Sequence, residues 1–526
     1  MSDNYNTVPA VDSEWEEDES SKCINSGVRD VSSKGDLVLT GNPRQRYLWQ
    51  SSSDIQSRQD VFDRCQGEIE EAFRSGGNHL VEGLMTTGKT RSSLGAAEEI
   101  GEPISILVNR GHKGMYRQIE NWCDELGLSY ERLPSSKDHC PNYNNIANKE
   151  GGLTPMHFHR FDDLPCQDDG PCDLEKAWDN IRNSQADVFI GYYVHAYVPS
   201  VCKGRTVVLD EFPSIDNFGT EVDNPNTVVS GFLDNVGDIP FSGWGDLTKY
   251  RYDDSTRKEG IEEIRRRRNS RNTTKAAERV FNNQSDDHVL AEDVVLLLLL
   301  AEEYEWELSS EWEYAPLGGR KVGAFNADEG EVTIINPPTF ESANGVVGLD
   351  GTPNHRMWET LLGRKLNHKR VMSDQERAHY MRFVMGLTFV QTTTTAIQPA
   401  YSGNGINYDK GKALLREVHH EYNEKPGLIT SDTVLSDFKG SSATANFVDD
   451  GLYYGNLKGS NSFKKKRLGV VFGAPEPSSD RVEKWSALLG VPQGSNGKKG
   501  INKSYGPIGD EILHQMREAN VLQAAM

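Results

Sequence analysis

The segment that most constrains this chain is GLMTTGKT at residues 83–90, which has the spacing of a phosphate-binding P-loop. The preceding residues 79–82 are typical of a strand, and the Ser- and Ala-rich segment after the loop is typical of a helix. In this arrangement backbone N–H groups surround phosphates, Lys89 contacts the β- and γ-phosphates, and the Thr90 hydroxyl ligates Mg²⁺. The sequence therefore predicts a site for ATP and Mg²⁺ where a strand meets a helix.

The segment TVVLDEFP at residues 206–213 supplies two carboxylates at the end of an apolar strand. Such a strand end is common by itself, but after a P-loop it indicates the second half of an ATP-hydrolysing site, because ligands bind at the carboxyl edge of these sheets. We expect Asp210 to hold Mg²⁺ through water, and Glu211 to orient and deprotonate the attacking water. The predicted catalytic residues are Lys89 and Glu211, the cofactor-binding residues are Gly83, Thr86, Thr87, Gly88, Lys89, Thr90 and Asp210, and the Mg²⁺ ligands are Thr90 and Asp210.

Strands and helices alternate around these segments, which predicts an α/β fold with parallel sheets and crossover helices. Two stretches interrupt the alternation and are interpreted as insertions: residues 127–186, rich in Pro, Cys and His, and residues 214–336, with a basic run and a Leu-rich buried helix. Residues 1–46 are polar without periodicity and are interpreted as a flexible acidic tail. The expected helices cover residues 55–74, 116–126 and 296–300, and the expected strands cover 79–82, 104–108, 188–191, 206–209, 346–349, 427–430 and 468–472.

The segment VVGLDGTP at residues 346–353 is another apolar strand that ends in a polar turn. In chain order, the P-loop, the Asp-Glu segment and this turn resemble motifs I, II and III of superfamily 2 helicases. The segments similar to further motifs of that family are residues 108–118 (motif Ia), 425–431 (motif IV), 456–463 with 467–477 (motif V of the XPD/DinG-like branch) and 522–526 (the beginning of motif VI). The resemblance covers about residues 55–526.

The resemblance implies two RecA-like P-loop NTPase domains, with residues 47–370 as the first and residues 371–526 as an incomplete second. It also implies a cytoplasmic ATP hydrolase that moves on DNA, at a single strand or a duplex junction, or on RNA. An alternative is a remnant of such a motor that binds ATP and nucleic acid without hydrolysis. A packaging ATPase joined to a nuclease would need a carboxylate cluster in the C-terminal half, where we find none. The residues expected to couple hydrolysis to movement are Asp350, Gly351, Thr352, Gly459, Ser460 and Gln523.

Motif VI of this family continues with arginines that reach the γ-phosphate, and the sequence stops before them. Because an arginine finger raises the rate by about 10³ or more, we expect slow hydrolysis by this chain alone. Arg517 is a candidate substitute, although a charged residue on an amphipathic helix is usually only solvated.

Cys140, Cys166, Cys172 and Cys202 are four of the cysteines that lie between the P-loop and the Asp-Glu segment. Four cysteines in this interval bind an iron–sulfur cluster in the XPD/DinG-like branch, so the resemblance implies such a cluster here. Zinc bound with nearby histidines is a second interpretation, and unligated cysteines in an irregular insertion are a third, because no CxxC pair is present. The residues concerned are Cys140, Cys166, Cys172 and Cys202, with His139, His157 and His159 as further zinc ligands.

The formal net charge of −22 disfavours long-range attraction to nucleic acid, so binding must use a local basic surface. The densest basic runs are residues 265–268 and 464–467. The first is either a solvated helix face or a contact to phosphates, with Tyr250 or Tyr252 stacking on bases. A continuous apolar run of about 18 residues is absent, so no membrane span is predicted, and the low number of cysteines indicates a reducing compartment.

Overall fold

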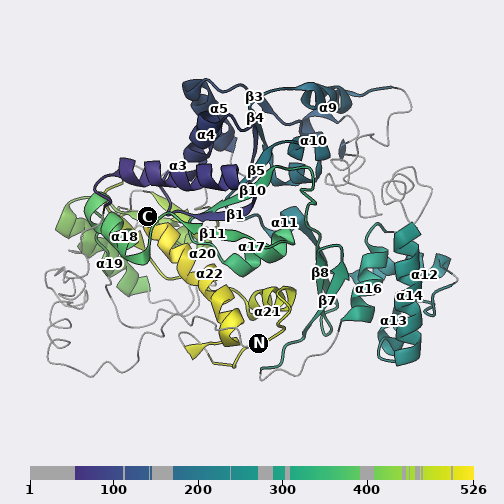
Figure 1. Ribbon diagram of the computed structural model, residues 1–526. Helices are drawn as coiled ribbons and strands as arrows, with labels where there is room; N and C mark the ends of the chain where they lie inside the picture. The colour runs from purple at the N-terminus through teal and green to yellow at the C-terminus, as the bar shows by residue number, and fades with distance from the viewer. Residues whose placement is uncertain are drawn as a thin grey trace, which may run out of the picture. The chain divides into compact units, whose positions relative to one another are not determined.

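The computed structural model describes residues 54–526 apart from 111–112, 141–142, 145–169, 237, 271–287, 302–307, 391, 393–407, 441–445, 449, 457–462, 464–465 and 499–501 (Figure 1). The predicted flexible tail at residues 1–46 lies outside the described residues. The chain forms two compact units. The larger unit consists mainly of Arg58–Met372 and Pro475–Ala524, and the smaller unit consists mainly of Ser373–Ala474.

The centre of the larger unit is a seven-stranded sheet in the order β11-β1-β10-β5-β2-β4-β3. Every pairing in it is parallel. Strands β2, β5 and β10 are buried along their whole length, as expected for parallel strands with both faces covered. The predicted α/β class with parallel sheets is therefore confirmed. The strands are β1 (Gly77–Glu82), β2 (Ile104–Val108), β3 (Tyr130–Arg132), β4 (Val188–Tyr192), β5 (Thr206–Asp210), β10 (Gly345–Asp350) and β11 (Asn367–Arg370).

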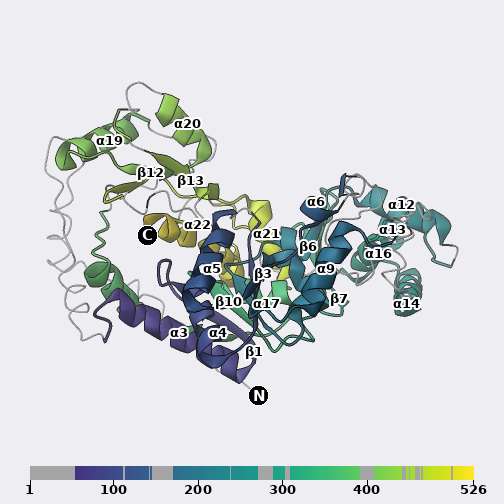
Figure 2. The same cartoon turned by 90° about the horizontal axis from the view of Figure 1, so that it is seen from above.

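Three helices from the N-terminal part of the larger unit pack in succession: α3 against α4, and α4 against α5 (Figures 1 and 2). They are α3 (Arg58–Ser75), α4 (Lys89–Ile100) and α5 (Lys113–Leu126). The first ends at Gly76 and Gly77, whose φ angles of 64° and 80° lie in the left-handed region that glycine tolerates. The helix predicted for residues 55–74 is thus observed, although it begins three residues later.

A second group of helices shares a hydrophobic core with the sheet. These helices are α17 (His355–Leu362), α21 (Ser479–Leu488) and α22 (Gly506–Ala525). Trp358 and Trp485 lie in the same buried cluster as Leu80 of β1 and Val207 of β5, and the Trp485 ring centroid is 6.0 Å from that of Phe212. Residues 475–524 therefore group with the larger unit. The predicted boundaries of the two functional domains stay a prediction.

The segment between the Asp-Glu pair and β10 forms an antiparallel sheet in the order β6-β9-β8-β7 with a hydrophobic core of its own. The Leu-rich run in α16 is buried in that core, as predicted, and neighbouring helices gather beside it (Figure 1). None of the described helices combines the length and apolarity needed to cross a bilayer. The elements are β6 (Gly219–Val222), β7 (Trp312–Gly318), β8 (Lys321–Asn326), β9 (Glu331–Ile335), α12 (Pro225–Asn235), α13 (Trp244–Tyr250), α14 (Asp254–Ser270) and α16 (Ala291–Leu300).

The stretch at residues 127–186, interpreted as an irregular insertion, contributes two elements to the main fold. β3 pairs with β4 at the edge of the large sheet, and α9 (Asp173–Asn183) buries Trp178 in the central core. The strand escaped prediction because it has only three residues and none of them is buried. The short helices along this part of the chain are α6 (Ser136–His139), η1 (Tyr193–Tyr197), α10 (Pro199–Cys202) and α11 (Ile215–Phe218).

The smaller unit contains a three-stranded sheet in the order β13-β12-β14, and both of its pairings are parallel. Its apolar core joins Leu428 of the central strand to Leu415 and Phe438 of the flanking helices. The second parallel sheet predicted from the sequence is therefore present. The elements are α18 (Asp374–His379), η2 (Tyr380–Val384), α19 (Tyr408–Tyr422), β12 (Gly427–Thr430), α20 (Asp432–Gly440), β13 (Gly451–Tyr453), η4 (Tyr454–Asn456) and β14 (Gly469–Val471).

A buried ion pair between Arg251 and Glu313 yields a prediction about stability. The two side chains are only 3% and 6% exposed. Glu313→Gln should lower the free energy of unfolding by about 3–5 kcal/mol, because it leaves the Arg251 charge buried without its partner. Urea denaturation followed by tryptophan fluorescence measures this. Glu125→Gln is the matched control, since the Glu125–Arg91 pair is exposed. Equal unfolding midpoints for the two variants would contradict the prediction.

Candidate functional site

The sheet topology brings three loops together at one edge. β10 lies between β1 and β5, with Glu82 paired to Asp350 and Leu349 paired to Asp210. Because all three strands are parallel, their carboxyl ends lie side by side, and each predicted motif begins where its strand ends. The P-loop, the Asp-Glu pair and the turn after Asp350 are therefore neighbours.

Lys89 lies inside the P-loop and is buried. Its Nζ donates to the carbonyl oxygens of Gly83, at 2.8 Å, and Leu84, at 3.4 Å. The same Nζ lies 3.8 Å from Glu211 Oε1. The lysine therefore lies within the loop and joins it electrostatically to the Asp-Glu pair.

Backbone geometry explains the glycine and threonine pattern of the loop. Gly88 has a φ of 77°, and a Cβ there would lie 2.7 Å from the Phe62 ring of α3. Thr86 also has a positive φ, 71°, while the Thr87 hydroxyl donates to the Leu84 carbonyl at 2.8 Å and closes the turn. Gly88 is therefore required both by its φ angle and by the packing of α3, a constraint the sequence pattern alone does not reveal.

Thr90 and Asp210, the two predicted Mg²⁺ ligands, meet directly. The Thr90 hydroxyl donates to Asp210 Oδ1 at 2.9 Å. A hydroxyl and a carboxylate are the hard oxygen donors that Mg²⁺ prefers. Together with the enclosed Lys89, these side chains fit a nucleotide with its Mg²⁺.

Glu211 adopts an unusual backbone conformation. Its φ is 71°, in the left-handed region that costs a residue with a side chain about 1–2 kcal/mol. Its N–H donates to the Leu349 carbonyl at 2.8 Å, and its own carbonyl accepts from the Tyr193 hydroxyl at 3.0 Å. That hydroxyl also donates to the carbonyl of Asp210. No sequence pattern points to Tyr193, because this contact is made only in the folded sheet.

The turn after β10 contacts the P-loop and is internally fixed. The Gly83 N–H donates to the Asp350 carbonyl at 3.0 Å, and a Cβ at Gly351 would lie 2.9 Å from Met85 Sδ. The Asp350 carboxylate accepts from the Thr352 N–H at 3.0 Å and from Trp358 Nε1 at 2.8 Å. The turn is therefore placed to respond to the loop. Of the other residues expected to act in coupling, Gln523 lies in α22, and Gly459 and Ser460 lie outside the described residues.

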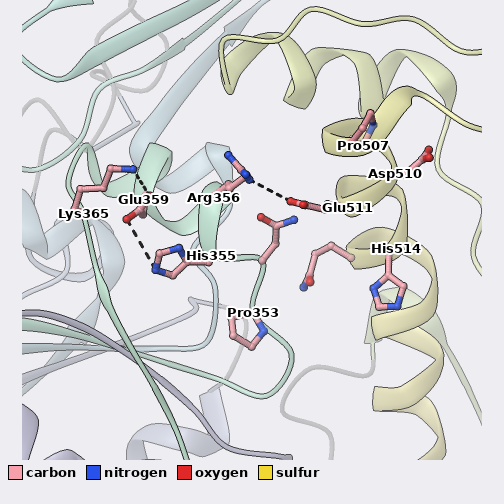
Figure 3. Close-up of a pocket in the computed structure, with 11 residues that line it drawn as sticks. Pro353, His355, Arg356, Glu359, Lys365, Pro507, Asp510, Glu511 and His514 are labelled. Carbon is pink, nitrogen blue, oxygen red and sulfur yellow. Dashed lines mark hydrogen bonds and ion pairs between the residues drawn. The ribbon is translucent and has the colours of Figure 1, made fainter. Parts of the chain in front are cut away.

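A pocket of about 720 Å³ opens beside this turn, between α17 and α22 (Figure 3). Arg356 pairs with Glu511 across it at 3.3 Å. On the α17 side, Glu359 lies 2.7 Å from Lys365 and 3.9 Å from His355. Both charge signs line the pocket, and several of its charged side chains pair with one another.

The cysteines do not form a ligand set in the described part of the chain. Cys140 and Cys202 belong to the central apolar core, with Cys172 packed against it. Among the described residues, only Glu329, Glu331 and Asp480 place three potential ligand atoms close together. Burial raises the pKa of the Cys202 thiol to about 12, and its Sγ donates to the Ala196 carbonyl at 3.5 Å. Cys202 is thus a buried thiol that is hydrogen-bonded within the apolar core, and its proposed role as a cluster or zinc ligand stays a prediction.

Most of the remaining members of the expected metal site cannot be compared with these cysteines. Cys166, His157 and His159 lie outside the described residues. His139 is exposed, and its Nδ1 lies 3.0 Å from the Ser135 carbonyl. The hypothesis that Cys140, Cys166 and Cys172 approach one another stays a prediction.

Two of the basic candidates are paired within the chain. Arg266 and Arg267 both form ion pairs with Glu263 and Asp238, which favours the solvated-helix interpretation of the run at residues 265–268. Tyr250 and Tyr252 remain exposed, at 40% and 56%.

Arg517 is also held by acidic side chains. It pairs with Glu476 at 3.6 Å and donates through Nε to Glu518 at 2.7 Å. These contacts do not favour Arg517 as a free charge for the γ-phosphate.

Comparison with known proteins finds likeness at the level of structure. No family model matches the chain, and neither does any curated protein. The chain is similar to a solved structure named "XPD_Helicase", with 12% identity, a TM-score of 0.40, and coverage of 88% of this chain and 92% of that one. It is also similar to "XPD_APO", with 12% identity, a TM-score of 0.38, and coverage of 87% and 91%. For "Structure of S. tokodaii Xpd4", the identity is 11%, the TM-score is 0.37, and the coverage is 88% and 91%.

The burial of Cys202 in the apolar core and its hydrogen bond to the Ala196 carbonyl yield a prediction about metal content. Cys202→Ala should leave the iron and zinc content of the protein unchanged, because this thiol is a hydrogen-bond donor in the core. Metal analysis and an absorbance scan on protein purified without oxygen measure this, with the less buried Cys172→Ala as the comparison variant. Loss of bound metal in Cys202→Ala alone would show that this cysteine is a ligand.

Proposed function

We propose that this chain is an ATP-driven nucleic-acid motor of the superfamily 2 helicase type, which hydrolyses ATP and couples the hydrolysis to movement on DNA or RNA. One observation carries the proposal: Lys89, Thr90, Asp210 and Glu211 converge at the carboxyl ends of β1 and β5, which flank β10, with Thr90 and Asp210 in direct contact. The site supports ATP hydrolysis, and the order of the motifs along the chain supports nucleic acid as the partner.

Each residue of the site has a role that follows from its chemistry. Lys89 binds the β- and γ-phosphates through its charge, and Thr90 and Asp210 hold Mg²⁺, which when bound neutralises charge on the phosphates. Glu211 orients the attacking water and accepts its proton. Phosphoryl transfer needs positioning and charge neutralisation more than covalent chemistry, and these four side chains can supply both.

The contact between the P-loop and the turn after β10 supports the coupling role proposed for Asp350, Gly351 and Thr352. In this structure Lys89 bonds to carbonyls of its own loop, so a bound phosphate must displace those contacts. Gly83 is bonded to the Asp350 carbonyl, so a shift of the loop is passed to the turn and to α17 behind it. Such a change is the kind of conformational step by which a motor closes around its nucleotide and opens again.

A second candidate, a protein that binds ATP and nucleic acid without hydrolysis, is favoured by the pairing of Arg517 with Glu476 and Glu518. Because Arg517 is paired with these carboxylates, Lys89 is the one positive side chain among the described residues of the larger unit that we propose to contact the γ-phosphate. Both proposed functions predict that the chain binds ATP, but only the motor is expected to release phosphate from it.

Lys89→Ala should abolish ATP binding or turnover while leaving the fold intact, because the lost charge acts on the phosphates and not on the apolar core. A titration with ATP in Mg²⁺, together with a thermal melt, measures both effects. Lys176→Ala, which removes a 62% exposed lysine, is the control. Unchanged affinity and turnover in Lys89→Ala would refute the P-loop assignment.

Glu211→Gln should keep ATP and Mg²⁺ affinity but lower hydrolysis by about 10² or more, because the amide cannot accept a proton from water. Single-turnover phosphate release and an ATP titration separate the two quantities. If ATP affinity falls as much as the rate, Glu211 holds the nucleotide and its proposed role is wrong.

A further inference from the structure

Tyr193 is a buried hydroxyl donor at the catalytic edge that the proposed roles do not use. It is the first residue of η1, directly after β4, and is 1% exposed. Its hydroxyl reaches the backbone carbonyls of both Asp210 and Glu211, with 3.0 Å to the latter. The backbone of the proposed metal ligand and of the proposed base is thus held by a single side chain from the short helix η1 that follows β4.

The contact falls where the backbone most needs support. Glu211 has a φ of 71°, a conformation that persists only where surrounding contacts enforce it. Its N–H is fixed by the Leu349 carbonyl at 2.8 Å, and its C=O is fixed by Tyr193. These two bonds hold the peptide groups on either side of the Glu211 Cα, and so set the direction in which its carboxylate leaves the strand.

The ring is held in place independently of the hydroxyl. The Tyr193 ring packs edge-on against Phe218, with centroids 6.4 Å apart, and both lie in the central core. The hydroxyl has one proton, which it donates to the pair of carbonyls.

We propose that Tyr193 is a positioning residue for ATP hydrolysis, which through its hydroxyl holds the backbone of Asp210 and Glu211 so that the Glu211 carboxylate is aimed at the attacking water. This rests on the proposed function, because it assigns Tyr193 to the same reaction. A hydroxyl with a merely structural role would affect stability without affecting turnover.

Tyr197 provides a matched control in the same short helix. Its hydroxyl also donates to a backbone carbonyl, that of Asn336, which is distant in sequence from the Asp-Glu pair. Its ring also contacts Phe218, with centroids 5.8 Å apart. Tyr193→Phe and Tyr197→Phe therefore each remove one donor while keeping the ring and the same aromatic neighbour.

The experiment compares single-turnover hydrolysis, ATP affinity and thermal melting for wild type, Tyr193→Phe, Tyr197→Phe, Glu211→Gln and the Tyr193→Phe/Glu211→Gln double variant. Tyr193→Phe should lower the hydrolysis rate roughly 10-fold or more and leave ATP affinity within about 2-fold, because a lost buried hydrogen bond misdirects Glu211 and not the phosphates. Tyr197→Phe should melt at a temperature similar to that of Tyr193→Phe, but it should hydrolyse ATP at close to the wild-type rate. In the double variant, the Tyr193 change should add no more than about 2-fold to the loss caused by Glu211→Gln, because Tyr193 acts through Glu211.

Three outcomes would overturn the proposal for Tyr193: equal rates for the two Tyr→Phe variants, a loss of ATP affinity in Tyr193→Phe, or fully additive losses in the double variant. Absence of phosphate release from ATP by the wild-type chain would instead contradict the proposed function itself. The two failures are therefore distinguishable in one set of measurements.

Discussion

The hydrogen bond from Thr90 to Asp210, 2.9 Å long, joins side chains that are 120 residues apart in the chain. It forms because β1 and β5 run parallel on either side of β10, so that all three strands end at one edge. If any of these strands ran the other way, its motif would emerge at the opposite edge and the site could not assemble. The parallel sheet is thus the constraint on which the P-loop, the Asp-Glu pair and the turn after β10 all depend.

The same constraint explains how the chain accommodates a large insertion near its site. A parallel sheet requires a crossover between successive strands, and the length of that crossover is not fixed by the sheet. Between β5 and β10, the chain uses this freedom to build an antiparallel sheet with a hydrophobic core of its own. That sheet also contributes Trp312, Ala324 and Ile335 to the core of the parallel sheet, so the insertion packs against the fold that carries the site.

The sequence could predict those helices and strands that are marked by a pattern in their own residues. Strands β2 and β12 are found at the predicted residues, 104–108 and 427–430, because each is a buried apolar run with clear boundaries. β3 and β6 were missed because they are short and half exposed.

For the site, the loop and carboxylate motifs were predicted correctly as neighbours, because parallel strands end at one edge. Tyr193 and Phe62 were missed, because tertiary packing alone brings them to the motifs. The cysteines, placed together by resemblance, are not gathered into a ligand set among the described residues.

The most direct test of the account is the rate of phosphate release from ATP by the wild-type chain in Mg²⁺, measured alone, with single-stranded DNA and with single-stranded RNA. If the four convergent side chains form the site of a nucleic-acid motor, the chain releases phosphate in a Mg²⁺-dependent reaction, and at least one of the two nucleic acids raises the rate. Absence of any phosphate release, or a rate that neither nucleic acid changes, would contradict the account.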